Sequence, residues 1–166
     1  MAKITLKGNE INTTGNMPKV GSEAPDVKLV KVDLSELALS DLRGKRVVMN
    51  IFPSLDTDVC ATSVRKFNEA VSKMPNTVVL AISKDLPFAQ ARFCTVEGIK
   101  NVIPLSGFRC NCLEEKYGLG IADGPLRGLY ARAVVVLDEN GKILYEELVP
   151  EIVQEPNYEA VIATLK

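Results

Sequence analysis

The sequence predicts an α/β protein with a central mixed β-sheet flanked by helices and a β-hairpin at the N-terminus. Two strand-length apolar runs, Arg46–Phe52 and Thr77–Ser83, are typical of buried central strands. Segments of helical periodicity alternate with such strands, and this alternation indicates βαβ connections with parallel strand pairs. A strong hairpin signal at Asp138–Gly141 appends an antiparallel pair late in the chain.

The N-terminal hairpin is predicted from two short stretches with alternating apolar residues. Ile4–Leu6 and Ile11–Thr13 flank the connection Lys7–Glu10. Within that connection, Gly8-Asn9 suits a two-residue turn.

The remaining elements follow from apolar periodicity and from helix end signals. The helix after Thr57 is predicted from apolar residues on one face, namely Val64, Phe67, Val71 and Met74. The next helix has Pro87 in its first turn and Gly98 just past its end. The other predicted elements are strands over Asp26–Val32, Val102–Leu105, Ala131–Leu137 and Lys142–Leu148, and helices over Leu86–Val96, Leu113–Tyr117 and Pro156–Leu165. This order is the one expected of a thioredoxin-like fold with an N-terminal extension.

Length and composition indicate a soluble globular protein. The 166 residues suggest one domain over 1–166, with residues 1–17 as the hairpin extension. Hydrophobic residues make up 46% and charged residues 25%. The net charge of -1 gives no support for nucleic-acid binding. The sequence shows neither a signal peptide nor the roughly 20 apolar residues of a membrane span, so we expect a cytoplasmic protein without membrane contact.

The sequence contains no histidine, and this narrows the possible chemistry. Ser-His-Asp and Cys-His catalysis and His-ligated metals are excluded. A nucleophile must instead be activated by a helix dipole, by an Arg or Lys charge, or by hydrogen bonds. The four cysteines (Cys60, Cys94, Cys110 and Cys112) are expected to be thiols in the cytoplasm, with any disulfide transient and redox-linked.

Cys60 is the candidate nucleophile because it falls where a buried strand passes into a helix. Thr57 or Asp58 can cap that helix, which places Cys60 in its first turn. The partial positive charge and free N–H groups there favour the thiolate without any histidine. Pro53 and its apolar neighbours can keep water from the sulfur. From position alone, a buried structural cysteine is an equally good interpretation.

The surrounding pattern, Pro53-x-x-x-Thr57-x-x-Cys60, resembles the active-site signature of peroxiredoxins. Longer stretches look like the thiol peroxidase subfamily, the atypical two-cysteine peroxiredoxins. These stretches are FPSLDTDVCATSVRKFN (52–68), DLPFAQARFC (85–94), GPLRGLYARAVVVLDENGK (124–142) and LVPEI (148–152). The resemblance covers most of the chain, and such extended runs are more specific than the short signature.

The resemblance implies a role for each matching residue. Cys60 would be the peroxidatic cysteine, whose thiolate attacks a hydroperoxide and becomes a sulfenic acid. Thr57 would bond the sulfur and the peroxide oxygen through its hydroxyl, and Pro53 would shield the pocket. Arg132 would stabilise the thiolate and the leaving oxygen with its fixed charge and fork of donors. Taken alone, Arg132 would more simply be a surface or edge-strand arginine.

The resemblance also implies how the enzyme is recycled. Cys94 would be the resolving cysteine, and the disulfide Cys60–Cys94 would form within one chain. The predicted elements put these cysteines on different helices, whereas a disulfide needs Cα atoms within about 7 Å, so we expect local unwinding. Thioredoxin would be the reductant, hydrogen peroxide and alkyl hydroperoxides the substrates, and antioxidant defence the role. The resemblance further implies a homodimer that needs no metal or other cofactor.

Some residues depart from the family pattern or lie outside it. Asp58 stands where an uncharged residue is more common, and we expect its carboxylate to face solvent and complement the helix dipole. Arg65 can add positive charge near the thiol or simply lie on a solvated face. Cys110 and Cys112 are open to three interpretations: incidental thiols, a backup resolving pair, or a metal site with Cys94. The metal site is the weakest because it offers three thiolates without recognisable spacing.

The sequence is compatible with three functional hypotheses. The main hypothesis is a thioredoxin-dependent peroxidase. One alternative is a peroxide-sensing redox relay that uses the same cysteine pair, and the lack of a visible output domain disfavours sensing as the sole role. The other is a noncatalytic thioredoxin-fold binding module. The joint presence of all five matching residues disfavours it: Pro53, Thr57, Cys60, Cys94 and Arg132.

Overall fold

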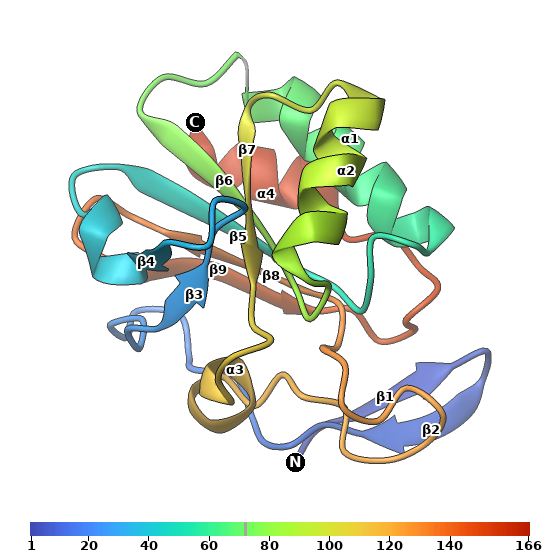
Figure 1. Cartoon of the computed structure of the whole chain (residues 1–166). Coiled ribbons are helices and arrows are strands. Elements are labelled where there is room, and N and C mark those ends of the chain that lie inside the picture. Colours follow the sequence, from blue (N-terminus) through green and yellow to red (C-terminus); the bar gives the residue numbers. More distant parts are fainter. Residues whose placement is uncertain (72) are drawn as a thin grey trace.

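A mixed sheet of seven strands, in the order β4-β3-β7-β6-β5-β8-β9, forms the centre of the protein in the computed structural model, which describes residues 1–71 and 73–166 (Figure 1). The strands are β3 (Lys28–Val30), β4 (Glu36–Ala38), β5 (Arg46–Ile51), β6 (Thr77–Ser83), β7 (Val102–Ser106), β8 (Ala133–Leu137) and β9 (Ile143–Leu148). β5, β6 and β7 pair in parallel, and β8 pairs antiparallel with both β5 and β9. The predicted mixed sheet is therefore confirmed.

The two faces of the sheet carry separate hydrophobic cores. Successive residues of a strand point to opposite faces, so Val47 and Met49 of β5 belong to one core and Val48 to the other. We call these the α3 core and the α1 core, after the helices that cover them. Because both faces are buried, the central strands are almost wholly apolar, and this is why their positions were predicted well.

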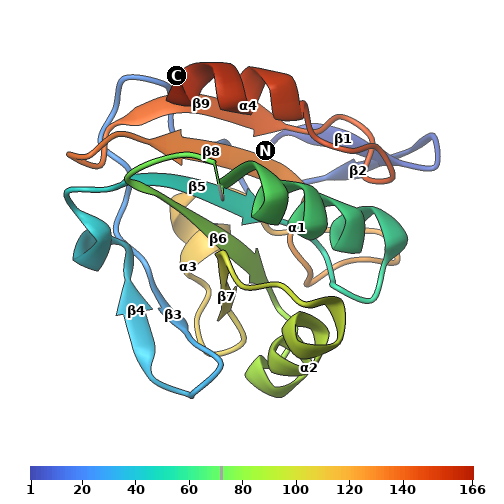
Figure 2. The same ribbon diagram turned by 90° about the horizontal axis from the view of Figure 1, so that it is seen from above.

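Three helices cover the α1 core (Figure 2). They are α1 (Asp58–Val71), α2 (Pro87–Glu97) and α4 (Tyr158–Leu165). Val64 and Phe67 are buried there as predicted, while the side chain of Val71 lies outside the described part of the chain. The short helix α3 (Cys112–Lys116) packs on the opposite core through Leu113. None of the helices formed by the described residues could serve as a membrane span.

The N-terminal hairpin stands apart from the main sheet as a second, two-stranded sheet of β1 (Lys3–Leu6) and β2 (Asn9–Asn12) (Figure 1). Its turn residues are Lys7 and Gly8, with φ of 51° and 83°, so the predicted turn at Gly8-Asn9 was one residue too late. A two-residue turn with positive φ at both positions matches the twist of the strands, and Gly8 supplies the second position at no steric cost.

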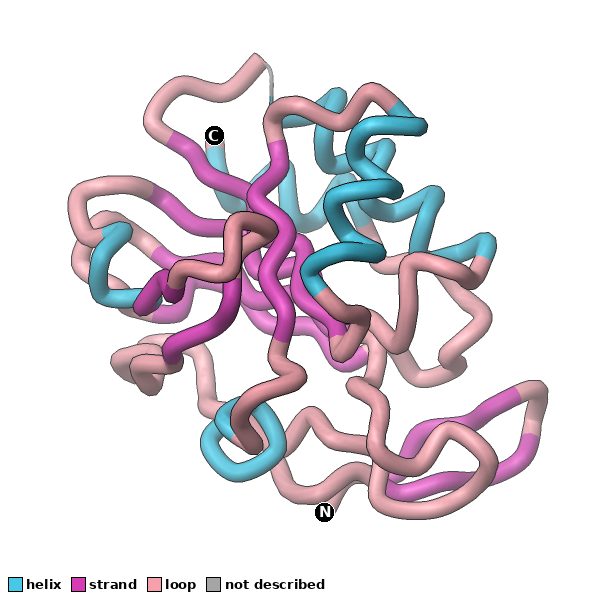
Figure 3. Tube along the Cα trace, in the orientation of Figure 1, coloured by secondary structure: helices cyan, strands magenta, loops and turns pink. Residues whose placement is uncertain are grey.

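A long connection without helix or regular strand, residues 117–132, lies beside this hairpin (Figure 3). The Asp123 carboxylate accepts hydrogen bonds from the backbone and side-chain N–H groups of Asn12, both at 2.8 Å. Ile4 and Ile11 of the hairpin are buried with Ile121 in a third, small core. The segment after β9 also holds the hairpin, because the Thr5 N–H donates to the Pro150 carbonyl at 2.8 Å and the Ile152 N–H donates to the Thr5 carbonyl at 2.9 Å.

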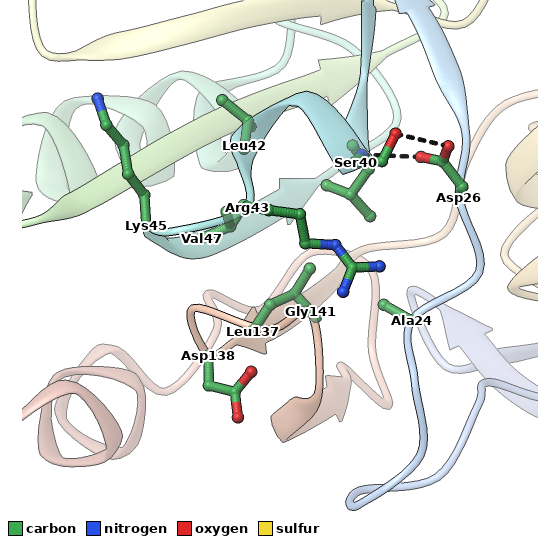
Figure 4. A pocket seen from close by; sticks show the side chains of 11 residues that line it. Ala24, Asp26, Ser40, Leu42, Arg43, Lys45, Val47, Leu137, Asp138 and Gly141 are labelled. Carbon is green, nitrogen blue, oxygen red and sulfur yellow. Dashed lines mark hydrogen bonds between the residues drawn. The ribbon is translucent and has the colours of Figure 1, made fainter.

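The region between the hairpin and β5 differs from prediction. The strand expected over Asp26–Val32 is limited to Lys28–Val30, and β4 and the 3-10 helix η1 (Leu39–Leu42) were not predicted. Asp26 leaves the sheet because its carboxylate accepts bonds from the backbone and hydroxyl of Ser40, both at 2.9 Å (Figure 4). The hollow in that figure has a volume of about 10 Å³, room for one water at most, so it offers no substrate site.

Candidate active site

The candidate site lies where β5 ends and α1 begins. The backbone N–H of Ala61 donates to the Thr57 carbonyl at 3.0 Å, which makes Thr57 the N-cap of α1. Cys60 is consequently the third residue of the helix, in its first turn as predicted. Asp58, the first residue, is exposed, as expected of a carboxylate that complements the helix dipole.

Cys60 is fully buried in the α1 core. Its neighbours in that core include Leu55, Val64 and Phe67. Phe52 and Pro53 before it are buried as well, in agreement with the predicted exclusion of water. The Cys60 sulfur is thus enclosed by apolar side chains and by the first turn of α1.

A groove of about 820 Å³ opens beside this turn, a size suited to a small organic ligand. It is lined by Leu6, Lys7, Asn9, Ile11, Pro53, Ser54, Thr57, Asp58, Val59, Pro125, Leu126, Leu129, Arg132, Ile152 and Val153. Three predicted site residues, Pro53, Thr57 and Arg132, thus meet at one surface. Neither Cys60 nor Cys94 is part of the lining. The outer wall comes from the hairpin and the 117–132 connection, which sequence patterns did not associate with the site.

Arg132 is a buried cation just before β8, with 2% of its surface exposed. Its Nε donates to the Ile152 carbonyl at 2.7 Å, which fixes the guanidinium in the groove wall. Its Nη1 is buried and has no hydrogen-bond partner within the described chain. Buried donors are nearly always paired, so this nitrogen is suited to an acceptor that arrives with the substrate.

Tyr158 and Glu155 extend the electrostatic surroundings of Arg132. The Tyr158 hydroxyl donates to the Glu155 carboxylate at 3.0 Å. Burial, followed by Glu155, raises the pKa of Tyr158; Arg132 opposes this rise and Cys60 adds to it. The Lys66 ammonium, hydrogen-bonded to Glu155, lowers the pKa of that carboxyl, with a smaller contribution from Arg132. Tyr158 and Glu155 therefore belong to the electrostatic environment of Arg132, and no pattern in the sequence indicated this.

The Thr57 hydroxyl is engaged within its own loop. It donates to the Ser54 carbonyl at 2.9 Å, and Thr57 is exposed to the groove. The hydroxyl oxygen can still accept a hydrogen bond through its lone pairs. To donate to a peroxide or to the sulfur, as the resemblance implies, the hydroxyl must turn away from Ser54.

Asp85 is a positioning residue that sequence reasoning missed. Its carboxylate accepts hydrogen bonds from the Ser54 hydroxyl and the Leu55 backbone N–H, both at 2.8 Å, and from the Ser83 hydroxyl at 2.7 Å. It ties the loop before α1 to the turn between β6 and α2. The three hydrogen bonds that this carboxylate accepts identify its positioning role, and they can be seen only in the structure. In the sequence, an Asp between a strand and a helix indicates only a turn.

Asp85→Asn is expected to lower the free energy of unfolding by about 1–3 kcal/mol, because an amide cannot accept these bonds with both of its polar atoms. The loop that carries Thr57 should loosen as well, so the reaction with peroxide should slow by roughly tenfold. Urea denaturation and stopped-flow kinetics measure the two effects. Asp56→Asn, which removes an exposed carboxylate of the same loop, is the matched control. Equal effects of the two variants would refute the positioning role.

Cys94 lies three residues before the end of α2, on a different helix from Cys60, as predicted. It is half-buried against the α1 core, and burial raises the pKa of its thiol. Both cysteines are free thiols. Arg65 does not serve Cys60: its guanidinium forms an ion pair with Glu97 at 3.0 Å and so links α1 to α2.

The raised pKa of Cys94 predicts a shifted alkylation profile in the native protein. Burial disfavours the thiolate, so thiolate forms only at higher pH than in an ordinary cysteine, whose pKa is about 8.5. In the variant Cys60→Ser/Cys110→Ser/Cys112→Ser, iodoacetamide should react at a rate that still rises above about pH 9.5. In urea the same variant should level off below that pH. Superimposable native and unfolded profiles would contradict the prediction.

Cys110 and Cys112 form a disulfide, with Cα atoms 5.4 Å apart. These two cysteines are therefore not thiols in this structure, unlike the default expected for all four, because the Cys-Asn-Cys spacing brings them within bonding reach. They pack against the α3 core, on the other face of the sheet from Cys60 and Cys94. Among the described residues, no group of three His, Cys, Asp or Glu side chains could hold a metal ion.

Comparison with known proteins defines the class to which this fold and site belong. Residues 19–162 match the model of the Redoxin family. The thiol peroxidase of Mycobacterium bovis is 57% identical over 165 residues, 99% of each chain. That of Corynebacterium glutamicum is 53% identical, again over 99% of each chain. A peroxiredoxin-like protein from Aquifex aeolicus superposes with a TM-score of 0.94 at 43% identity, over 99% of this chain and 96% of that one.

The chain therefore belongs to the Redoxin family, in the thioredoxin-like superfamily. A thiol peroxidase from Chromobacterium violaceum shares the fold, with a TM-score of 0.90 at 21% identity over 98% of this chain and 94% of that one. Within the family, the full-length relatives place the chain among the thiol peroxidases, which are oxidoreductases acting on peroxide through a cysteine pair.

Proposed function

We propose that the protein reduces hydrogen peroxide and organic hydroperoxides with Cys60 as the peroxidatic and Cys94 as the resolving cysteine. The observation that carries this proposal is the unpaired buried Nη1 of Arg132 in the groove beside the first turn of α1. A fixed cation with a free donor stabilises an oxyanion, and the helix N-terminus next to it favours a thiolate.

In the first step, the Cys60 thiolate attacks the terminal oxygen of the hydroperoxide. The O–O bond breaks, the sulfur becomes a sulfenic acid, and the alkoxide or hydroxide leaves and takes up a proton. Arg132 Nη1 donates to the oxygen on which negative charge develops. Neither a metal nor an imidazole is needed, because the guanidinium keeps its charge throughout the pH range of activity.

The groove supports organic hydroperoxides as substrates. Its wall is largely apolar, with Leu6 and Ile11 from the hairpin and Leu126 and Leu129 from the 117–132 connection. An alkyl substituent would bury its surface against these side chains, which contributes about 25 cal/mol per Å². Hydrogen peroxide has no such substituent, so discrimination between the two substrates should appear in KM.

In the second step, the Cys94 thiol attacks the sulfenic acid, and a disulfide and water form. Both cysteines lie in helices, so the first turn of α1 and the end of α2 must unwind first. A thioredoxin-type dithiol protein then reduces the disulfide by thiol exchange. The setting proposed for this cycle is antioxidant defence in the cytoplasm by a homodimer, as the resemblance implies.

Disulfide mapping tests the assignment. The reduced protein is treated with one equivalent of cumene hydroperoxide, blocked with an alkylating agent and digested. We expect a peptide pair joined through Cys60 and Cys94, which thioredoxin, its reductase and NADPH then convert back to two thiols. A disulfide that joins other cysteines, or Cys60 and Cys94 both alkylated after exposure to peroxide, would refute the proposal.

A further inference from the structure

The disulfide Cys110–Cys112 is too short-ranged to act as a structural staple. It spans a sequence separation of 2. Stabilisation by a disulfide comes largely from restricting the unfolded chain, and it grows with the length of the closed loop. A ring that encloses one residue restricts little, so the gain in folding stability does not account for this bond.

The bond is also separate from the Cys60–Cys94 pair. The sheet lies between the two pairs, because one pair packs on the α3 core and the other on the α1 core. Direct thiol exchange within one chain is thus blocked. Cys110 and Cys112 are both partly exposed, so the disulfide lies near the surface, where an external dithiol can approach it.

Lys84 connects this bond to the rest of the protein. Its ammonium donates to the carbonyls of Gly107 at 2.9 Å and Cys110 at 3.1 Å, and it forms an ion pair with the Glu114 carboxylate at 2.9 Å. Its three N–H groups therefore bond residues on both sides of the disulfide. The side chains of Lys84 and Glu114 are only 18% and 19% exposed, so dissolved salt weakens this ion pair little.

The contacts continue from Lys84 to the active-site loop without a gap. The next residue is Asp85, whose carboxylate holds Ser54 and Leu55 at the start of that loop. A second link runs from the Ser106 hydroxyl to the Asp85 carbonyl at 2.6 Å. A change at the disulfide thus bears on the loop that leads into the first turn of α1, the turn that must unwind for resolution.

We propose that Cys110–Cys112 is a second redox site, which an external dithiol reduces and which restrains the active-site loop when oxidised. A thiolate of the dithiol attacks one sulfur, the other sulfur leaves as a thiolate, and the second thiol of the reductant resolves the mixed disulfide. Two electrons and two protons pass to the cysteines, and the reductant becomes a disulfide. Residues 107–112 then loosen, Lys84 and Asp85 hold Ser54 and Leu55 less firmly, and Cys60 reaches Cys94 faster. This effect on rate rests on the proposed function, whereas the redox couple does not.

The redox couple is tested in the variant Cys60→Ser/Cys94→Ser. After equilibration with reduced or oxidised dithiothreitol, free thiols are trapped with N-ethylmaleimide and counted by mass spectrometry. We expect two labels in the reduced and none in the oxidised sample. Adding Cys112→Ser should give one label under both conditions. Two labels in the oxidised sample of the first variant would overturn the proposed site.

The restraint is tested by the rate of Cys60–Cys94 bond formation after one equivalent of peroxide. Cys110→Ser/Cys112→Ser should form the bond about threefold faster than wild type in which Cys110–Cys112 is oxidised while Cys60 and Cys94 are thiols. A threefold change is the size of a modest coupling between sites. In a Lys84→Met background of unchanged Tm, the same pair of substitutions should have no effect. Equal rates in the two proteins that keep Lys84 would overturn the restraint. If the wild type forms no Cys60–Cys94 bond at all, the proposed function fails, and the thiol count still decides the redox site.

Discussion

Cys60→Ser is expected to abolish reduction of both hydrogen peroxide and organic hydroperoxides. A serine hydroxyl stays protonated near neutral pH and is a far weaker nucleophile than a thiolate, so the rate should fall by on the order of 10⁴-fold or more. Peroxide consumption with thioredoxin, its reductase and NADPH measures turnover, and stopped-flow mixing measures the first reaction. Because Cys60 is fully buried, a hydroxyl there costs about 1–3 kcal/mol. Cys60→Ala, which buries no hydroxyl, should be equally inactive.

Cys94→Ser separates the two half-reactions. The variant should reduce one equivalent of peroxide at the wild-type rate and then stop, because its sulfenic acid has no resolving thiol. Full activity of Cys60→Ser would refute the peroxidatic assignment. Continued turnover of Cys94→Ser would move resolution to another thiol. The sheet between the two cysteine pairs argues against Cys110 and Cys112 of the same chain in that role.

Arg132→Met is expected to slow the reaction of the reduced enzyme with peroxide by about 10²–10³-fold, the usual cost of losing one donor to a developing oxyanion. Methionine fills a similar volume without charge. The Ile152 carbonyl loses its buried donor, which should lower the free energy of unfolding by about 1–3 kcal/mol, so Tm is measured alongside the rate. The rate constant for sulfenic acid formation, followed by stopped flow, measures the effect.

Two variants sharpen the test of Arg132. Arg132→Lys keeps the charge but not the fork of donors, so its rate should fall between wild type and Arg132→Met. Arg65→Met removes a partly exposed arginine whose ion pair joins α1 to α2, and its rate should stay within a few-fold of wild type. A loss of less than tenfold in Arg132→Met would contradict the role proposed for Arg132.

The central part of the fold could be predicted from the sequence because burial on both faces leaves a continuous apolar run. β6 occupies Thr77–Ser83 as predicted, and β5 ends one residue before the predicted Phe52. The peripheral elements were harder to predict from the sequence. β4 has three residues, only one of them strongly apolar, and it is defined by its pairing with β3. Such pairing leaves almost no periodicity in the chain.

Part of the candidate site could likewise be predicted from the sequence, and part of it could not. The place of Cys60 at a helix start follows from local patterns, and the roles of Cys94 and Arg132 came from the resemblance. The role of Asp85 depends on contacts between two segments of the chain, one at Ser54 and one at 83–85. The groove wall depends on a hairpin more than a hundred residues from Arg132. Contacts between distant segments are set by the tertiary fold, so no spacing in the sequence predicts them.

The hairpin that forms the outer wall of the groove is built on its own small core. Ile4 and Ile11 pack with Ile121 and Ile152, apart from the sheet, and the Glu151 carboxylate accepts the Gly8 N–H at 2.8 Å. A unit with few buried contacts opens at a lower free energy than the whole protein. Hydrogen exchange should therefore be faster in β1 and β2 than in β5 and β6. Because the hairpin lines the groove, its local opening would widen the groove while the sheet that holds Cys60 stays folded.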